Sequence, residues 1–196
     1  AAMLAVPSSA LNADDGCPKV RIGGYIGERI DVCNRGMVLS RDVDELVEPF
    51  RHKDDTKSWS TEFIGKWMLG AMDMYRYNGD PALLAKIEAG IRDLVSTQET
   101  DGFIGSYAPG ARLKHWDIWG RKYTALALLS YYDLTGDKAV LDAAARSIDC
   151  LINDLESRDA DIARTGNYFG IASCSVLLPV LWLYRETGGE ACLDFA

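Results

Sequence analysis

The sequence HWDIWGRKYTALALLSYYDLTGDKAVLDAAARSIDCL, residues 115–151, has the pattern of a helical hairpin. Apolar residues recur near helical spacing on both sides of Gly136, and alanine is dense between them, as in helices that pack closely. Gly136 suits the turn because a residue just beyond a helix end commonly adopts positive φ, which costs glycine nothing. Asp137 is placed to cap the second helix. The stretch therefore predicts helices over about 117–134 and 138–155.

Two similar hairpins flank this one along the chain. Their turn glycines, Gly79 and Gly188, lie 57 residues before and 52 residues after Gly136. A regular period indicates an array of helical pairs, which either stays open as a solenoid or closes into a ring. The sequence therefore predicts an all-α fold, with further helices over about 62–77, 82–98 and 175–186 and the start of another before residue 196.

The segments before the first hairpin carry weaker signals. Residues 1–16, AAMLAVPSSALNADDG, are expected to be a flexible leader, either the end of a secretory signal region or an ordinary disordered segment. Residues 17–50 read as a lead-in with a short helix over about 40–48. One domain of helical repeats is expected over 17–196. Because its last helix stops about one turn after it starts, we expect the chain to be a fragment of a longer protein.

Composition narrows the classes of partner. The formal net charge is -8, from 21 basic and 29 acidic residues, which argues against a nucleic-acid or anionic-membrane surface. No apolar run approaches the roughly 20 residues that span a bilayer. The five cysteines form no CxxC pair and predict no metal site. Three of them are expected to be small buried hydrophobes: Cys150, Cys174 and Cys192.

Four motifs carry a resemblance to a known family: GGYIGERID at 23–31, WSTEFIGKWM at 59–68, QETDGFIGSY at 98–107, and the tract that begins at His115. Together they resemble the N-terminal part of β-L-arabinofuranosidase-like proteins, glycoside hydrolase family 127 and its relatives, over about residues 20–196. The resemblance implies an (α/α)6 toroid of which about half is present. It also implies a carbohydrate substrate, L-arabinofuranose units of plant glycans, and a periplasmic or extracellular bacterial protein, although a cytoplasmic one is also compatible.

The resemblance further implies two groups of site residues that face a central cleft. Aromatic rings stack on the C–H faces of sugars, while charged and imidazole groups bind hydroxyls. The family's catalytic glutamate and cysteine-rich zinc site match none of the cysteines in this chain, so the nucleophile and any zinc are expected outside it, with no metal or cofactor within. The expected substrate-binding residues are Trp59, Glu62, Lys66 and Trp67 in one group, and His115, Trp116, Asp117, Trp119, Arg121 and Lys122 in the other.

Several of these residues also have simpler explanations. Asp117 is a plausible helix N-cap, and Glu62 and Lys66, four apart, form an ordinary helical ion pair. The loop 100–110 is glycine-rich and is expected to form the rim of a binding site. A glycosidase of the usual kind needs two carboxyl groups at one bond, and the candidates here are Glu62, Asp101 and Asp117.

Three functions are compatible with the sequence. The leading hypothesis is an exported arabinofuranosidase-like glycoside hydrolase of which this chain supplies sugar-binding walls, so that the isolated chain is expected to be inactive. The second is a toroidal hydrolase of unsaturated uronyl sugars, which protonates a double bond without a metal. The third is a helical-repeat module that binds a glycan or a protein without chemistry.

Overall fold

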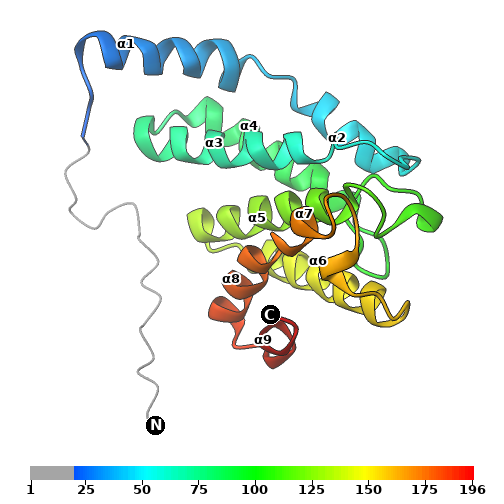
Figure 1. Cartoon of the computed structure of the whole chain (residues 1–196). Coiled ribbons are helices and arrows are strands. Elements are labelled where there is room, and N and C mark those ends of the chain that lie inside the picture. The colour runs from blue at the N-terminus through cyan, green and yellow to red at the C-terminus, as the bar shows by residue number, and fades with distance from the viewer. Residues whose placement is uncertain (1–19) are drawn as a thin grey trace, which may run out of the picture.

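The computed structural model describes residues 20–196, so the expected leader over 1–16 and Cys17 lie outside it. Helices dominate this part of the chain (Figure 1), where no strand occurs and Asp55 and Tyr107 form an isolated β-bridge. The elements are α1 (Gly24–Cys33), the π-helix η1 (Asn34–Leu39), α2 (Val43–His52), α3 (Glu62–Asn78), α4 (Pro81–Ser96), the 3₁₀-helix η2 (Pro109–Ala111), α5 (Asp117–Thr135), α6 (Lys138–Glu156), the 3₁₀-helix η3 (Ile162–Arg164), α7 (Ile171–Cys174), α8 (Leu177–Thr187) and α9 (Glu190–Phe195).

The three expected hairpins are present as α3/α4, α5/α6 and α8/α9. Their turn glycines Gly79, Gly136 and Gly188 have φ angles of 66°, 72° and 69°. Each glycine N–H donates to a carbonyl four residues earlier at 2.7 Å, which closes the preceding helix. The acceptors are the carbonyl oxygens of Tyr75, Tyr132 and Tyr184.

Aspartates start the second helix of the first two hairpins. The carboxylates of Asp80 and Asp137 accept from the N–H groups of Ala82 and Ala139, each at 2.9 Å. Each satisfies a donor that a helix start otherwise leaves free. The third hairpin has Gly189 in this position, without a side-chain cap. The first two hairpins therefore share the aspartate cap, and the third hairpin lacks it.

Helices α3 and α5 pack against each other in parallel. Gly65 of α3 approaches so closely that an added Cβ would lie 2.5 Å from the carbonyl oxygen of Tyr123. Gly120 of α5 is the reciprocal contact, since a Cβ there would lie 2.0 Å from the hydroxyl oxygen of Thr61. Two glycines thus let the backbones of the first two hairpins meet.

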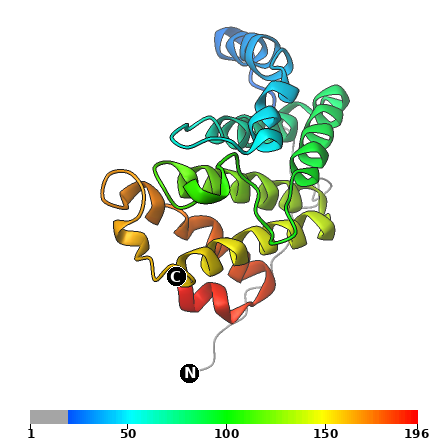
Figure 2. The same ribbon diagram turned by 90° about the vertical axis from the view of Figure 1, so that its right-hand side faces the viewer.

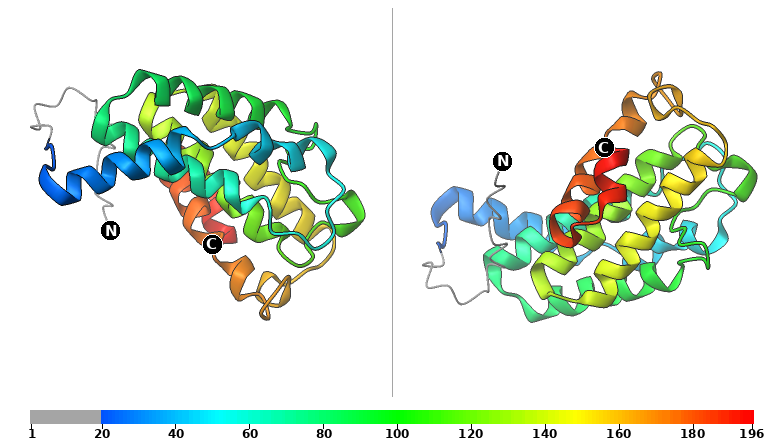
Figure 3. Two further views of the ribbon diagram at one scale, coloured as in Figure 1. Left: turned by 90° about the horizontal axis from the view of Figure 1, so that it is seen from above. Right: turned by 90° about the horizontal axis from the view of Figure 1, so that it is seen from below.

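Helix α5 occupies the middle of the molecule. It packs against α3, α6 and α8, and most of its residues are buried. The three hairpins follow one another in chain order, so that the colour passes from green through yellow to red across the turned view (Figure 2) and in the views from above and below (Figure 3). The small alanine side chains of α5 suit its central position, because Ala125 and Ala127 are 1% and 0% exposed between neighbouring helices.

The N-terminal segment differs from the expected lead-in. Residues 24–39 are helical, as α1 followed by η1, and the expected short helix over 40–48 is α2, displaced to Val43–His52. Gly23 at the start of α1 gives no side-chain cap, so the local sequence lacks the usual start signal. The segment is instead tied to α3, whose Tyr77 hydroxyl accepts from the N–H of Ile22 at 3.1 Å.

Two cysteines fit the expected buried class and one does not. Cys150 and Cys192 are 4% and 3% exposed, whereas Cys174, at the end of the short helix α7, is exposed. The expectation for Cys174 was wrong because α7 is only one turn long and turns that residue outward. No helix within residues 20–196 combines the length and the apolar character that a membrane crossing needs.

Candidate functional site

Glu62 links the N-terminal ends of α3 and α5. Its carboxylate accepts a hydrogen bond from the indole N–H of Trp119 and pairs with the ammonium of Lys66 at 2.9 Å. The Glu62 side chain is only 12% exposed. The ion pair expected between Glu62 and Lys66, four residues apart, is therefore present. Glu62 also accepts a hydrogen bond from Trp119 in the next hairpin.

Four aromatic side chains surround this link, and we call them the aromatic cluster: Trp116, Trp119, Tyr123 and Tyr168. They meet edge to face, with ring centroids 6.1 Å apart for Trp116 and Trp119, 5.2 Å for Trp119 and Tyr123, and 5.6 Å for Trp116 and Tyr168. Such pairs hold each other's orientation. Half-buried tryptophans beside an exposed tyrosine leave aromatic surface open to solvent.

Sequence reasoning missed two members of the cluster. Tyr123 follows Trp119 by four residues on one helix, so helical periodicity could have grouped them. Tyr168 comes from the loop between α6 and α7, and no local pattern connects it with α5. Tyr168 and Phe169 both have positive φ, 55° and 52°, and Phe169 is 93% exposed.

Lys122 places a positive charge against the cluster. Its ammonium nitrogen lies 3.6 Å from the ring centroid of Trp119 and 3.9 Å from that of Tyr123. The residue is 7% exposed. Burial and the nearby charge of Lys66 lower the pKa of Lys122 to about 8, although Glu62 acts in the opposite direction. Within residues 20–196 Lys122 forms no ion pair.

Three loops meet at the start of α5. The backbone carbonyl of His115 accepts from the N–H of Asn167 at 3.0 Å, which fastens the loop that carries Tyr168. The hydroxyl of Tyr107 donates to the carbonyl of Ser58 at 2.8 Å and accepts from the N–H of Trp116 at 3.2 Å. Burial raises the pKa of Tyr107 to about 12, so the hydroxyl stays protonated and keeps its donor role.

The two tryptophans expected beside Glu62 lie in different surroundings. Trp59 lies three residues before the start of α3 and is 55% exposed, and its carbonyl accepts from the N–H of Glu62 at 3.2 Å. Trp67 packs against the core, and its indole donates to the carbonyl of Val38 at 3.1 Å. The expectation that Trp67 faces the same cleft was wrong, because the N-terminal segment covers that side of α3.

Asp117 and Arg121 lie on the opposite side of α5 from Trp119. Their positions are about 40° apart around the helix, whereas Trp119 is about 160° from Asp117. The carboxylate of Asp117 accepts from the N–H of Leu113 at 2.8 Å and pairs with Arg121 at 3.0 Å. Asp117 is also not the N-cap, since Trp116 holds that position without a side-chain cap. The expectation of one shared cleft was therefore wrong for this pair, whose side chains are 1% and 2% exposed.

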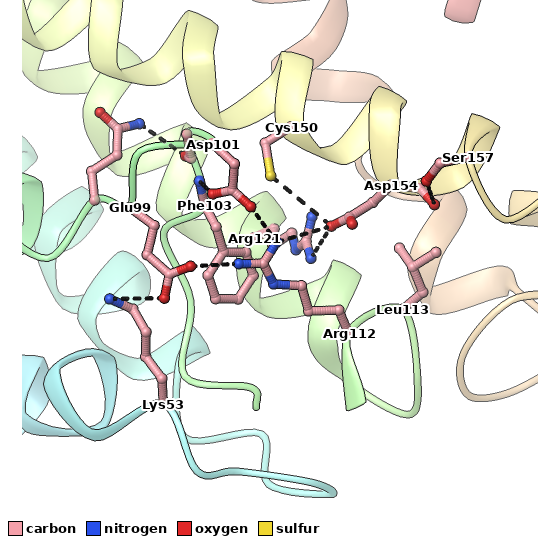
Figure 4. A network of polar contacts seen from close by, with 12 residues as sticks. Lys53, Glu99, Asp101, Phe103, Arg112, Leu113, Arg121, Cys150, Asp154 and Ser157 are labelled. Carbon is pink, nitrogen blue, oxygen red and sulfur yellow. Dashed lines mark hydrogen bonds and ion pairs between the residues drawn. The ribbon is translucent and has the colours of Figure 1, made fainter. Parts of the chain in front are cut away.

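Arg121 belongs to a polar network between α5, α6 and the loop 97–116 (Figure 4). It pairs with Asp154 of α6 at 2.7 Å. Arg112 pairs with Glu99 and Asp101, each at 2.6 Å. The ring of Phe103 lies 3.8 Å from the Arg112 guanidinium and 4.5 Å from that of Arg121. We call this set the buried network: Glu99, Asp101, Phe103, Arg112, Asp117, Arg121 and Asp154.

The loop 100–110 is part of the packed interior rather than a rim. Its aromatics Phe103 and Tyr107 are each 1% exposed. Although burial opposes it, the hydrogen bond from Arg112 lowers the pKa of Asp101, as expected for a carboxylate held by a guanidinium. The expectation of a binding-site rim was wrong for the buried part of the loop, because Phe103 packs against the two buried arginines, Arg112 and Arg121.

The three candidate carboxylates do not converge on one bond. Glu62 lies beside the aromatic cluster, bonded to Trp119, whereas Asp101 and Asp117 belong to the buried network. In the part of the chain that the structure describes, no three His, Cys, Asp or Glu side chains are grouped so as to hold a metal ion. The residues present therefore do not fit the zinc site that the resemblance implies.

The described helices form an arc of hairpins with the inner helices in parallel, which is the architecture of a helical toroid seen in part. The chain belongs to the family defined by the β-L-arabinofuranosidase GH127 catalytic domain, whose model matches residues 25–196.

Solved structures show the same fold. The chain is similar to a structure titled "Glycoside hydrolase", with a TM-score of 0.61 and 22% identity over 90% of this chain and 25% of that one. It is also similar to Ara127N-Se, a GH127 β-L-arabinofuranosidase from Geobacillus stearothermophilus T6, with a TM-score of 0.65 and 20% identity over 90% of this chain and 31% of that one. The chain thus spans about a quarter to a third of these proteins. No curated protein sequence matches it.

Proposed function

We propose that this chain supplies one wall of the substrate cleft of a glycoside hydrolase that releases L-arabinofuranose units from plant glycans. The observation that carries the proposal is the aromatic cluster with Glu62 and Lys122, gathered at the N-terminal ends of two parallel helices of a GH127 catalytic domain. Open aromatic faces suit the C–H surface of a sugar, and charged groups among them suit its hydroxyls.

Glu62 is the best-placed polar group for a sugar hydroxyl. The Trp119 indole and the Lys66 ammonium fix its carboxylate, so little conformational entropy is lost when a ligand binds. We assign Glu62 to substrate positioning and assign no catalytic acid or nucleophile, because no second candidate carboxylate joins it.

The remaining parts of the proposal follow from the family. A zinc site with a cysteine nucleophile would lie outside residues 20–196, and an exported protein would meet plant glycans outside the cell. Membership of the catalytic-domain family favours this function over unsaturated-uronyl hydrolysis and over a module without chemistry.

Hydrolysis of p-nitrophenyl β-L-arabinofuranoside by the full-length protein tests the proposal. We expect turnover, and a Trp116→Ala variant should raise KM because an open stacking surface is lost. Trp67→Phe is the matched control, since Trp67 packs against the core outside the cluster. Turnover of a 4,5-unsaturated uronide with none of the arabinofuranoside would replace the proposal by the unsaturated-uronyl alternative. A protein that binds glycan and hydrolyses neither substrate would replace it by the module without chemistry.

A further inference from the structure

The charges around the aromatic cluster do not balance. Lys66 and Lys122 bring two ammonium groups, and Glu62 is the only carboxylate that acts on Lys122 within the described residues. Both oxygens of Glu62 are already engaged, one with the Lys66 ammonium and the other with the Trp119 indole. One positive charge therefore stays without a counterpart, and it is that of Lys122.

An unpaired, nearly buried ammonium is uncommon, because a buried charge is costly unless it is paired and hydrogen-bonded. The rings of Trp119 and Tyr123 compensate in part through cation–π contact at 3.6 and 3.9 Å. Such contact gives the three N–H donors of the ammonium no protein acceptor within the described residues, so they remain free to bond water or a ligand.

The chain does not lack carboxylates with which to pair a buried cation. It carries a net charge of -8, and on the other face of the same helix Arg121 has two carboxylates, Asp117 at 3.0 Å and Asp154 at 2.7 Å. The contrast between Arg121 and Lys122 on one helix indicates that the missing partner of Lys122 comes from outside the described residues.

We propose that the Lys122 ammonium, with Lys66 beside it, binds the carboxylate of an acidic sugar in the glycan, so that the site takes a uronic acid residue against the aromatic cluster. This inference rests on the proposed function, because it names a substrate class for the same cleft. A single uncompensated positive charge matches a singly charged carboxylate. The flanking aromatic faces match the C–H surface of the sugar that carries it.

D-Galacturonate and D-galactose test the proposal, because the two sugars differ only at C6, which is a carboxylate in galacturonate and a hydroxymethyl group in galactose. Their affinities for the full-length protein are measured by NMR titration at neutral pH. We expect galacturonate to bind about fivefold more tightly, the size of effect that a partly screened ion pair gives, and added salt should reduce the preference. Lys122→Met should abolish the preference. Lys138→Met, which removes an exposed lysine outside the cluster, should leave it unchanged.

A second measurement needs no variant. The Lys122 side-chain resonance should report a higher pKa when galacturonate is added and no change when galactose is added, since a bound carboxylate favours the charged form. Equal affinities for the two sugars, or a preference that survives in Lys122→Met, would overturn the proposal. So would an unchanged Lys122 resonance at saturating galacturonate, which is the outcome expected if a carboxylate from another part of the protein already occupies the ammonium.

The two proposals fail in different ways. If the protein hydrolyses the neutral arabinofuranoside but shows no preference for galacturonate, only the uronate site is overturned. If galacturonate is preferred through Lys122 and the arabinofuranoside is not hydrolysed, the uronate site stands and the proposed function is wrong.

Discussion

Trp119 donates its indole N–H to Glu62, a residue 57 positions earlier in the chain. The same separation divides the turn glycines Gly79 and Gly136, and it also divides Arg76 from Asp133, which pair at 2.9 Å near the other end of the helices. Equivalent positions of successive repeats therefore lie side by side, and α3 and α5 run parallel in register. This register gathers the N-terminal ends of the inner helices, where the aromatic cluster lies.

Gly65→Ala should destabilise the protein by about 1–3 kcal/mol, because the added methyl group would overlap the backbone of α5. Its Cβ would lie 2.5 Å from the carbonyl oxygen of Tyr123, and backbone cannot rotate away. Gly70→Ala is the matched control on the same helix, where nothing lies within 4 Å, and it should raise stability by about 0.5–1 kcal/mol. Urea unfolding followed by circular dichroism measures both. Equal effects of the two substitutions would contradict the close approach of α3 and α5.

Arg121→Met should cost about 3–5 kcal/mol, because it leaves Asp117 buried without its cation. Arg76→Met removes an arginine that joins α3 to α5, in a pair whose side chains are 39% and 50% exposed, and should cost less than about 1 kcal/mol. Chemical denaturation compares the two variants. A cost for Arg121→Met no larger than that for Arg76→Met would show that the buried network contributes little to the fold.

The hairpins could be predicted from the sequence because their signals are local. Gly136 needs a left-handed backbone, Asp137 caps the next helix, and apolar residues recur at helical spacing between them. The helix α1 could not be predicted, because its start has no side-chain cap and the segments on either side of it, at Ile22 and in η1, are the parts that bond to α3. Local signals therefore sufficed for the elements that fold on their own pattern and failed for the one that depends on a distant partner.

The residues of the candidate site were only partly predictable for a similar reason. Sequence proximity placed Asp117 and Trp119 in one group, although side chains two residues apart on a helix lie about 160° apart around its axis. Tyr168 joins the cluster through a loop whose path no local pattern indicates. The position of Trp67 outside the cluster could not be predicted without knowing that the N-terminal segment covers it. The motif that begins at His115 therefore predicted where α5 starts. Which of its residues join the aromatic cluster and which join the buried network could be learned only from how the helices pack.

Tyr107→Phe should cost about 1–2 kcal/mol, since it leaves the carbonyl of Ser58 without its donor. It should also weaken sugar binding, because the same hydroxyl accepts from the N–H of Trp116 and holds the start of α5. Tyr25→Phe is the control, at a residue that is 67% exposed. Unfolding experiments and a glycan titration on each variant measure the two effects. Unchanged stability in Tyr107→Phe would contradict the role of this hydroxyl in joining the loops.

Lys122 should make the stability of the protein depend on pH in alkaline solution. Its pKa is about 8 in the folded state and 10.5 ordinarily, so between these values the unfolded state binds more protons and stability rises with pH. Below about pH 8 the ammonium is charged in both states, and its burial costs the folded state up to about 3 kcal/mol. Lys122→Met removes this dependence.

The free energy of unfolding of the two proteins should therefore diverge as the pH falls from about 10.5 to about 8, with the methionine variant gaining relative stability, and stay parallel below. Comparing the two proteins cancels the titration of every other group that the substitution leaves undisturbed. Urea unfolding at pH values across this window measures the difference. A difference that stays constant with pH would mean that Lys122 is solvated in the folded state, which would also remove the basis for its unpaired charge.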